Sequence, residues 1–204
     1  MDEIAPQELV VHPALRRVVS IVALLNIAYF GIEFAVATTI GSVSLFADSI
    51  DFFEDAAVNL LVLLALGWSA PRRALVGLLL GLLLVAPGLG TLWTAWQKLG
   101  APLPPSPLPL TLAGLGALAI NLSCALMLAR WRETHGSLTR AAFLSARNDA
   151  IANVAIVAAG LATMVYPSAW PDLIVGLGIL LMNANAVREI WEAAHKELRA
   201  VPAG

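Results

Sequence analysis

Charged side chains are scarce in this sequence, at 13% of its 204 residues. Soluble domains carry about 25% charged residues, whereas 59% of this chain is hydrophobic. The 12 basic and 14 acidic residues nearly balance, which differs from the clustered basic surface of nucleic-acid-binding proteins. The composition therefore predicts an integral membrane protein and argues against a nucleic-acid partner.

Cysteine and histidine are rare as well. The one cysteine, Cys124, cannot form an internal disulfide and gives no information on redox compartment. The three histidines, His12, His135 and His195, fall outside the apolar stretches, and the sequence has no nucleotide-binding loop or nucleophile elbow. An intramembrane enzyme would need a nucleophile–base pair or a histidine-bearing metal site. We therefore expect no enzyme and no permanently bound cofactor.

Long apolar runs dominate the rest of the chain. A helix needs about 20 apolar residues to cross the hydrocarbon of a bilayer. The first run is too long for the 7–15-residue core of a signal peptide, so we interpret it as a retained span. The sequence predicts an all-α, polytopic six-helix bundle with spans near 18–40, 44–67, 73–97, 108–130, 141–165 and 170–193.

The basic residues indicate how the bundle is oriented. With a cytoplasmic N-terminus, ten of the 12 lie inside, Lys98 lies outside and Arg147 falls within the fifth span. This bias follows the positive-inside rule, and it places both termini in the cytoplasm. We expect a cytoplasmic tail over 1–15, a transmembrane domain over 16–195, and a short cytoplasmic tail over 196–204 without a further domain.

The second predicted span holds four carboxylates: Asp48, Asp51, Glu54 and Asp55. Each acid near the centre of a membrane helix costs about 2.5–3.5 kcal/mol to insert, so these residues are expected to have a function. Asp51 and Asp55 are about 40° apart around the helix and about 6 Å apart along it. A carboxylate pair with this spacing can hold a divalent cation, and Asp48 shares its face.

The fifth predicted span carries a matching acid. Asp149 has Ser145 one turn before it and Asn153 one turn after it, on the same helical face. Spans 2 and 5 run antiparallel, so Asp51, Asp55 and Asp149 reach the middle of the bilayer, where transporter sites usually lie. The alternative is that the polar residues only join helices to one another. That alternative explains a single Asn better than three carboxylates at one depth.

Two further charged residues, Arg147 and Glu33, each have two alternative roles. Arg147 points about 160° away from Asp149, so it either reaches the inner interface or pairs with Glu33 or Glu54. Glu33, in the first span, is either a structural partner or a residue of the ion pathway.

Two motifs carry a family resemblance. The segment 41–49, followed by Asp51 and Asp55, resembles the second-helix signature of the cation diffusion facilitator family. Asn148, Asp149 and Asn153 resemble its fifth-helix motif. The resemblance implies metal ligands at Asp51, Asp55 and Asp149, with Asp48, Asn148, Asn153 and Glu33 around the site or along the pathway. Ser145 occupies the position of the family's usual fifth-helix histidine, so it is expected to be a weak ligand.

The resemblance also implies a function. A homodimer in a membrane, here a bacterial inner membrane, would export a divalent ion in exchange for protons by alternating access. Zn²⁺ is the first candidate because it is the commonest substrate of the family and accepts Asp oxygens. Cd, Co, Fe and Mn stay open because oxygen-rich sites also suit harder ions. The alternatives are a proton-conducting, structural or metal-sensing membrane protein without metal transport.

Overall fold

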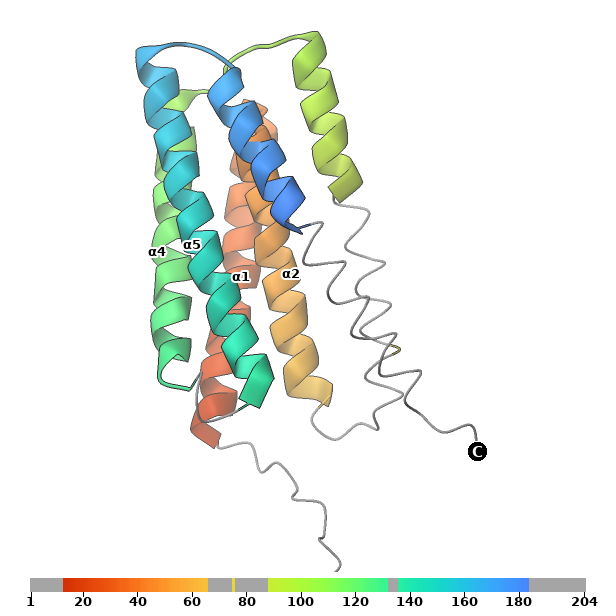
Figure 1. Ribbon diagram of the computed structural model, residues 1–204, viewed down its shortest axis with the longest axis vertical. Helices are drawn as coiled ribbons and strands as arrows, with labels where there is room; N and C mark the ends of the chain where they lie inside the picture. The colour runs from red at the N-terminus through yellow and green to blue at the C-terminus, as the bar shows by residue number, and fades with distance from the viewer. Residues whose placement is uncertain (1–12, 66–74, 76–87, 132–135, 184–204) are drawn as a thin grey trace, which may run out of the picture.

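Figure 1 shows a computed structural model of the protein, which describes residues 13–65, 75, 88–131 and 136–183. Four long helices run through it: α1 (Pro13–Ile40), α2 (Val43–Ala65), α4 (Pro107–Ala129) and α5 (Gly136–Val165). Two further helical segments, 88–100 and Trp170–Asn183, stand beside them. These described residues contain no strand, so the prediction of an all-α bundle is confirmed.

Successive helices run in opposite directions, which gives the bundle two distinct ends. The α1–α2 turn, the connection into α4 and the connection from α5 to Trp170 lie together at the top of Figure 1. We call this end the Gly41 end. The opposite end, where α2 finishes and α5 starts, is the Ala65 end. The positive charge bias of the sequence predicts that the Gly41 end is the outer one.

The turn between α1 and α2 is set by Gly41. Its φ of +64° lies in the left-handed region, which glycine enters without a steric penalty. The Ser42 N–H then donates to the Ala37 carbonyl at 3.0 Å, the long bond of a Schellman motif. This motif ends α1 and lets α2 start two residues later, so the two helices pack side by side.

The surface of the bundle shows that it belongs in lipid. Helices α1 and α4 and residues Phe143–Val165 of α5 are each long and apolar enough to cross a membrane. Helix α2 has 23 residues, a sufficient length, but it carries four acids. Large apolar side chains such as Leu24 and Leu126 face outward, whereas polar ones such as Asn26 and Asn121 are buried. Burial of the polar groups keeps them away from hydrocarbon.

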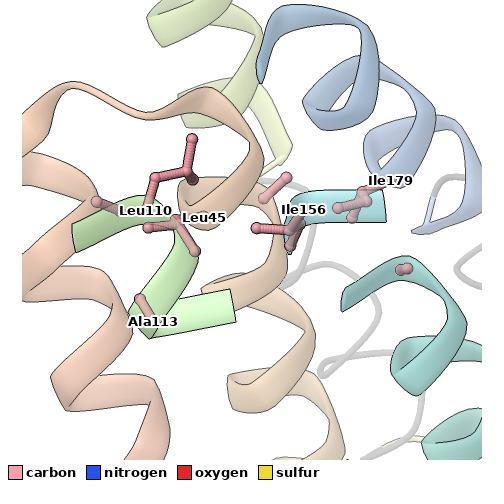
Figure 2. Close-up of a cluster of buried hydrophobic side chains, with 8 residues drawn as sticks. Leu45, Leu110, Ala113, Ile156 and Ile179 are labelled. Atoms are coloured by element: carbon pink, nitrogen blue, oxygen red, sulfur yellow. The ribbon is translucent and has the colours of Figure 1, made fainter. Parts of the chain in front are cut away.

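Close helix contacts bring the polar groups of different helices together. Helix α4 packs along α5, and α1 packs along both α2 and α4. Gly160 on α5 allows this approach, because a Cβ atom there would collide with Thr111 of α4. A buried apolar cluster near the Gly41 end includes Leu45, Leu110 and Ile156 (Figure 2). The cluster fixes the register of α2 against α4 and α5 directly above the acidic residues.

Candidate metal site

The carboxylates of α2 differ in their access to solvent. Asp48 is completely buried, whereas Asp51 and Asp55 are only partly buried. Asp48 lies nearest the Gly41 end, and each later acid lies further along the helix toward the Ala65 end. Exposure of the acids therefore begins at Asp51, on the Ala65 side of the apolar cluster.

Ser145 joins α5 to the acids of α2. Its hydroxyl lies 2.9 Å from Asp55 Oδ1 and 3.5 Å from Asp149 Oδ2. A serine hydroxyl has one proton to donate, and the shorter distance assigns that proton to Asp55. The Asp55 and Asp149 carboxyls also lie within hydrogen-bonding reach of each other. One side chain of α2 and two of α5 thus meet at a single point.

Asp51 is the third acid near this meeting point. It interacts electrostatically with Asp149 across the helix interface and with Asp48 and Asp55 on its own helix. No three His, Cys, Asp or Glu side chains of the described residues are close enough together to hold one metal ion. The acids are therefore neighbours in this conformation, but they are not drawn into a closed coordination shell.

Asn153 faces the buried acid rather than the exposed ones. Its amide donates to Asp48 Oδ2 at 2.5 Å, and its carbonyl oxygen accepts from the Asn121 amide at 3.0 Å. All three side chains are buried. Asn153 therefore orients Asp48 and links it to α4.

Asn148 and Arg147 lie away from the acids. Both side chains are exposed, and Arg147 Nη2 donates to Asn148 Oδ1 at 3.1 Å. Of the two expectations for Arg147, the one of a pair with Glu33 or Glu54 is therefore not realised. Asn148 stands next to Asp149 in sequence, but at about 100° per residue its side chain leaves the shared face.

Glu33 is completely buried on α1, opposite Asp48. Its neighbours are acids of α2 and Tyr29, whose hydroxyl donates to the Ala113 carbonyl at 2.6 Å. A cation that pairs with Glu33 is not found among the described residues.

Comparison with protein families matches residues 19–196 to the cation efflux transmembrane domain. The match covers most of the 204 residues and includes every acid described above. The chain belongs to this family. The curated proteins include no match to it. As a cation efflux protein, it is an integral membrane transporter of metal cations, which agrees with the resemblance stated from its two motifs.

One polar cluster of this cation efflux domain was not predicted from the sequence. Asp172, from the Trp170–Asn183 helix, accepts hydrogen bonds from Ser42, Ser44 and the backbone N–H groups of Val43 and Ser44. Lys98 Nζ lies 3.3 Å from the same carboxylate and also donates to the Gly41 carbonyl. The cluster is buried at the Gly41 end. The local sequence signal was an acid next to a proline, and this pair of residues does not indicate which groups the acid contacts.

Proposed function

We propose that the protein exports a divalent metal ion in exchange for protons, with Asp51, Asp55 and Asp149 as the ligands and Ser145 as a weak fourth. The observation that carries the proposal is the Ser145 hydroxyl, which lies between Asp55 and Asp149. It makes the side chains of α2 and α5 converge at one depth, as a shared site requires.

Metal binding needs only a local rearrangement of this junction. A dication would replace the Ser145 proton as the group that Asp55 contacts, and it would draw Asp51 and Asp149 toward the same point. Three carboxylates carry more negative charge than one dication neutralises, so protons and metal compete for the same oxygens. That competition supports an exchange of metal for protons at one site.

The choice of metal follows from the ligand atoms. All the candidate ligands present oxygen, which Zn²⁺ accepts and which Mn²⁺ also favours. Zn²⁺ is the first candidate because it is the most frequent substrate in the family. Cd, Co, Fe and Mn ions are the alternative substrates. Ser145 stands where a histidine would bias a site toward Zn²⁺, so weak discrimination among these ions is expected.

The burial gradient supports alternating access. Toward the Gly41 end, the apolar cluster with Leu45 and Ile156 covers the acids. Toward the Ala65 end, Asp51 and Asp55 become partly exposed among the described residues. This conformation corresponds to access from the side predicted to be cytoplasmic. Export then requires a second conformation in which the Gly41 end opens.

A homodimer in a bacterial inner membrane stays part of the proposal. The glycine-bearing face of the third predicted span is its first candidate interface, because small residues let helices approach closely. Gly77 and Gly81 lie outside the described residues, whereas a Cβ atom on Gly90 would meet Phe46 of the same chain at 3.4 Å. The Gly90 part of that face therefore packs within the protomer, so it is not available for a partner.

Calorimetry on the purified protein tests the metal site directly. Titration with Zn²⁺, Co²⁺ and Mn²⁺ should show binding that Asp55→Asn abolishes. Glu54→Gln is the matched control, because this partly buried acid precedes Asp55 on the same helix and makes no bond to Ser145. If wild-type protein bound none of the ions, the alternative of a proton-conducting or structural membrane protein would be favoured.

A further inference from the structure

Four helices contribute one polar side chain each to a buried chain of contacts at the centre of the bundle. Asn121 of α4 donates to Asn153 of α5, which donates to Asp48 of α2. Asp48 in turn lies within hydrogen-bonding reach of Glu33 on α1. All four residues are at most 2% exposed. The series of contacts ends at Glu33, neither of whose oxygens has a hydrogen-bond donor among the described residues.

The Glu33 end of this series of contacts lacks hydrogen-bond donors among the described residues. Asp48 Oδ2 is satisfied by Asn153, but Asp48 Oδ1 and both oxygens of Glu33 have no donor among the described residues. The hydroxyl of Tyr29, which interacts electrostatically with both acids, already donates to the Ala113 carbonyl. Two carboxyl groups face each other, and three of their four oxygens lack a proton to accept.

Asp172 shows what this fold does with a buried carboxylate that is charged. That side chain is also fully buried, but it accepts bonds from two hydroxyls, two backbone N–H groups and Lys98. An unpaired buried ion costs several kcal/mol. Glu33 and Asp48 have no such set of donors among the described residues. Ionisation of both side chains would therefore cost more free energy than burial of the Asp172 carboxylate does.

We infer that Glu33 and Asp48 share one bound proton and form a second ionisable site, a proton-binding pair beside the metal site. A hydrogen bond between two carboxyls exists only when one of them is protonated. The shared proton supplies the missing donor, and Asn153 holds the Asp48 oxygen on the other side. Release of this proton to water leaves two adjacent negative charges.

The charged surroundings of the pair determine when it can release its proton. Tyr29 faces it from α1, Asp51 and Asp55 from α2, and Asp149 from α5. No described Lys or Arg does, and no described hydrogen bond joins the pair to the three proposed metal ligands. A dication among those ligands is therefore the one positive charge that could favour release. This link to transport rests on the proposed function, whereas the pair itself does not.

Infrared spectroscopy can detect the shared proton through the C=O stretching band of a protonated carboxyl. We would compare Glu33→Gln, Asp48→Asn and the double variant, all in a Glu54→Gln background to remove a further α2 acid. Zn²⁺-loaded and metal-free samples are both recorded. Either amide can donate to the remaining carboxylate, so each single variant should lose the same band and the double variant should lose no more.

Other patterns would overturn the inference. An unchanged band in both single variants means that the pair holds no proton. Partial losses that add up in the double variant, or a loss in one single variant alone, mean separate acids rather than a shared proton. A second measurement is proton release on Zn²⁺ binding in weak buffer, which should fall in Glu33→Gln while Zn²⁺ still binds. An unchanged release would contradict a role in exchange.

The two proposals can fail separately. A band with the predicted pattern in a protein that binds no metal would refute the metal site and leave the proton pair standing. Metal binding that depends on Asp55, without the predicted band, would refute the pair alone.

Discussion

Removal of Asp172 is expected to destabilise the bundle more than removal of its ionic partner Lys98. Asp172 accepts five hydrogen bonds, and two of them come from the first backbone N–H groups of α2. Asp172→Ala would remove the acceptor of those groups and of two serine hydroxyls, and it would leave the Lys98 ammonium with the Gly41 carbonyl alone. The loss of a partner from a buried ion pair typically costs about 3–5 kcal/mol.

Lys98→Met removes fewer hydrogen bonds from the cluster than Asp172→Ala does. The Lys98 contact to Asp172 is the longest of the five, at 3.3 Å, and the carboxylate keeps four donors and the positive end of the α2 dipole. The substitution also removes the bond from Lys98 to the Gly41 carbonyl. We expect a loss of about 1.5–3 kcal/mol, in the range of a hydrogen bond that involves a charged group. The double variant should cost less than the sum of the two single variants, because both disrupt one cluster.

Reversible unfolding in mixed micelles with increasing SDS, followed by circular dichroism, measures these free energies. Gln97→Met is the matched control, since Gln97 precedes Lys98, is exposed, and should change stability by less than about 0.5 kcal/mol. Equal losses for the two single variants, or a larger loss for Lys98→Met, would refute the view that Asp172 caps α2 and that Lys98 only supplements it.

Three further predictions concern the site and the helix packing. Asp51→Asn, Asp55→Asn and Asp149→Asn should each abolish metal flux in vesicles while membrane insertion, checked by protease protection, is unchanged. Ser145→His should raise the preference for Zn²⁺ over Mn²⁺ by roughly tenfold, equivalent to about 1.4 kcal/mol, in a two-metal flux assay; equal losses for both ions would place residue 145 outside the site. Gly160→Leu should lower stability by about 1–3 kcal/mol, because its side chain meets Thr111, whereas Gly178→Ala, with open space around it, should be nearly neutral in the same SDS titration.

Helix positions were largely predictable because hydropathy and length determine them. The predicted span 108–130 lies within one residue of Pro107–Ala129, and 44–67 lies close to Val43–Ala65. The helices α1 and α5 start about five residues earlier than predicted. The prediction began at the apolar run, whereas each helix continues into the more polar flank. In α1 this flank carries Arg16 and Arg17, whose side chains are exposed.

The face shared by Ser145 and Asp149 was also predictable, since helical periodicity fixes which residues align along one helix. Their role as metal ligands stays a prediction. Periodicity does not determine which faces of different helices meet. The contact between Glu33 and Asp48 therefore could not be derived from the sequence, although the family resemblance placed both acids around the site or along the pathway.

Asp172 shows the same limit over a longer range. Its partners Ser42 and Ser44 precede it by about 130 residues in sequence, and Lys98 lies on a third helix. Nothing local to the Trp170–Asn183 helix distinguishes a capping carboxylate from an interfacial one. These groups come together through tertiary packing. A Cβ atom on Gly176 would lie 2.7 Å from Val43 at the start of α2, and Val43 also packs with Ala95 and Leu173.

Metal uptake into proteoliposomes with an imposed pH gradient tests the central claim most directly. Wild-type protein should move Zn²⁺ against a concentration gradient, driven by protons that move in the opposite direction, and the internal pH should change as metal accumulates. Asp55→Asn should abolish both signals, whereas Glu54→Gln should retain them. Zn²⁺ transport that is independent of the pH gradient, or that persists in Asp55→Asn, would contradict metal–proton exchange at the site between α2 and α5.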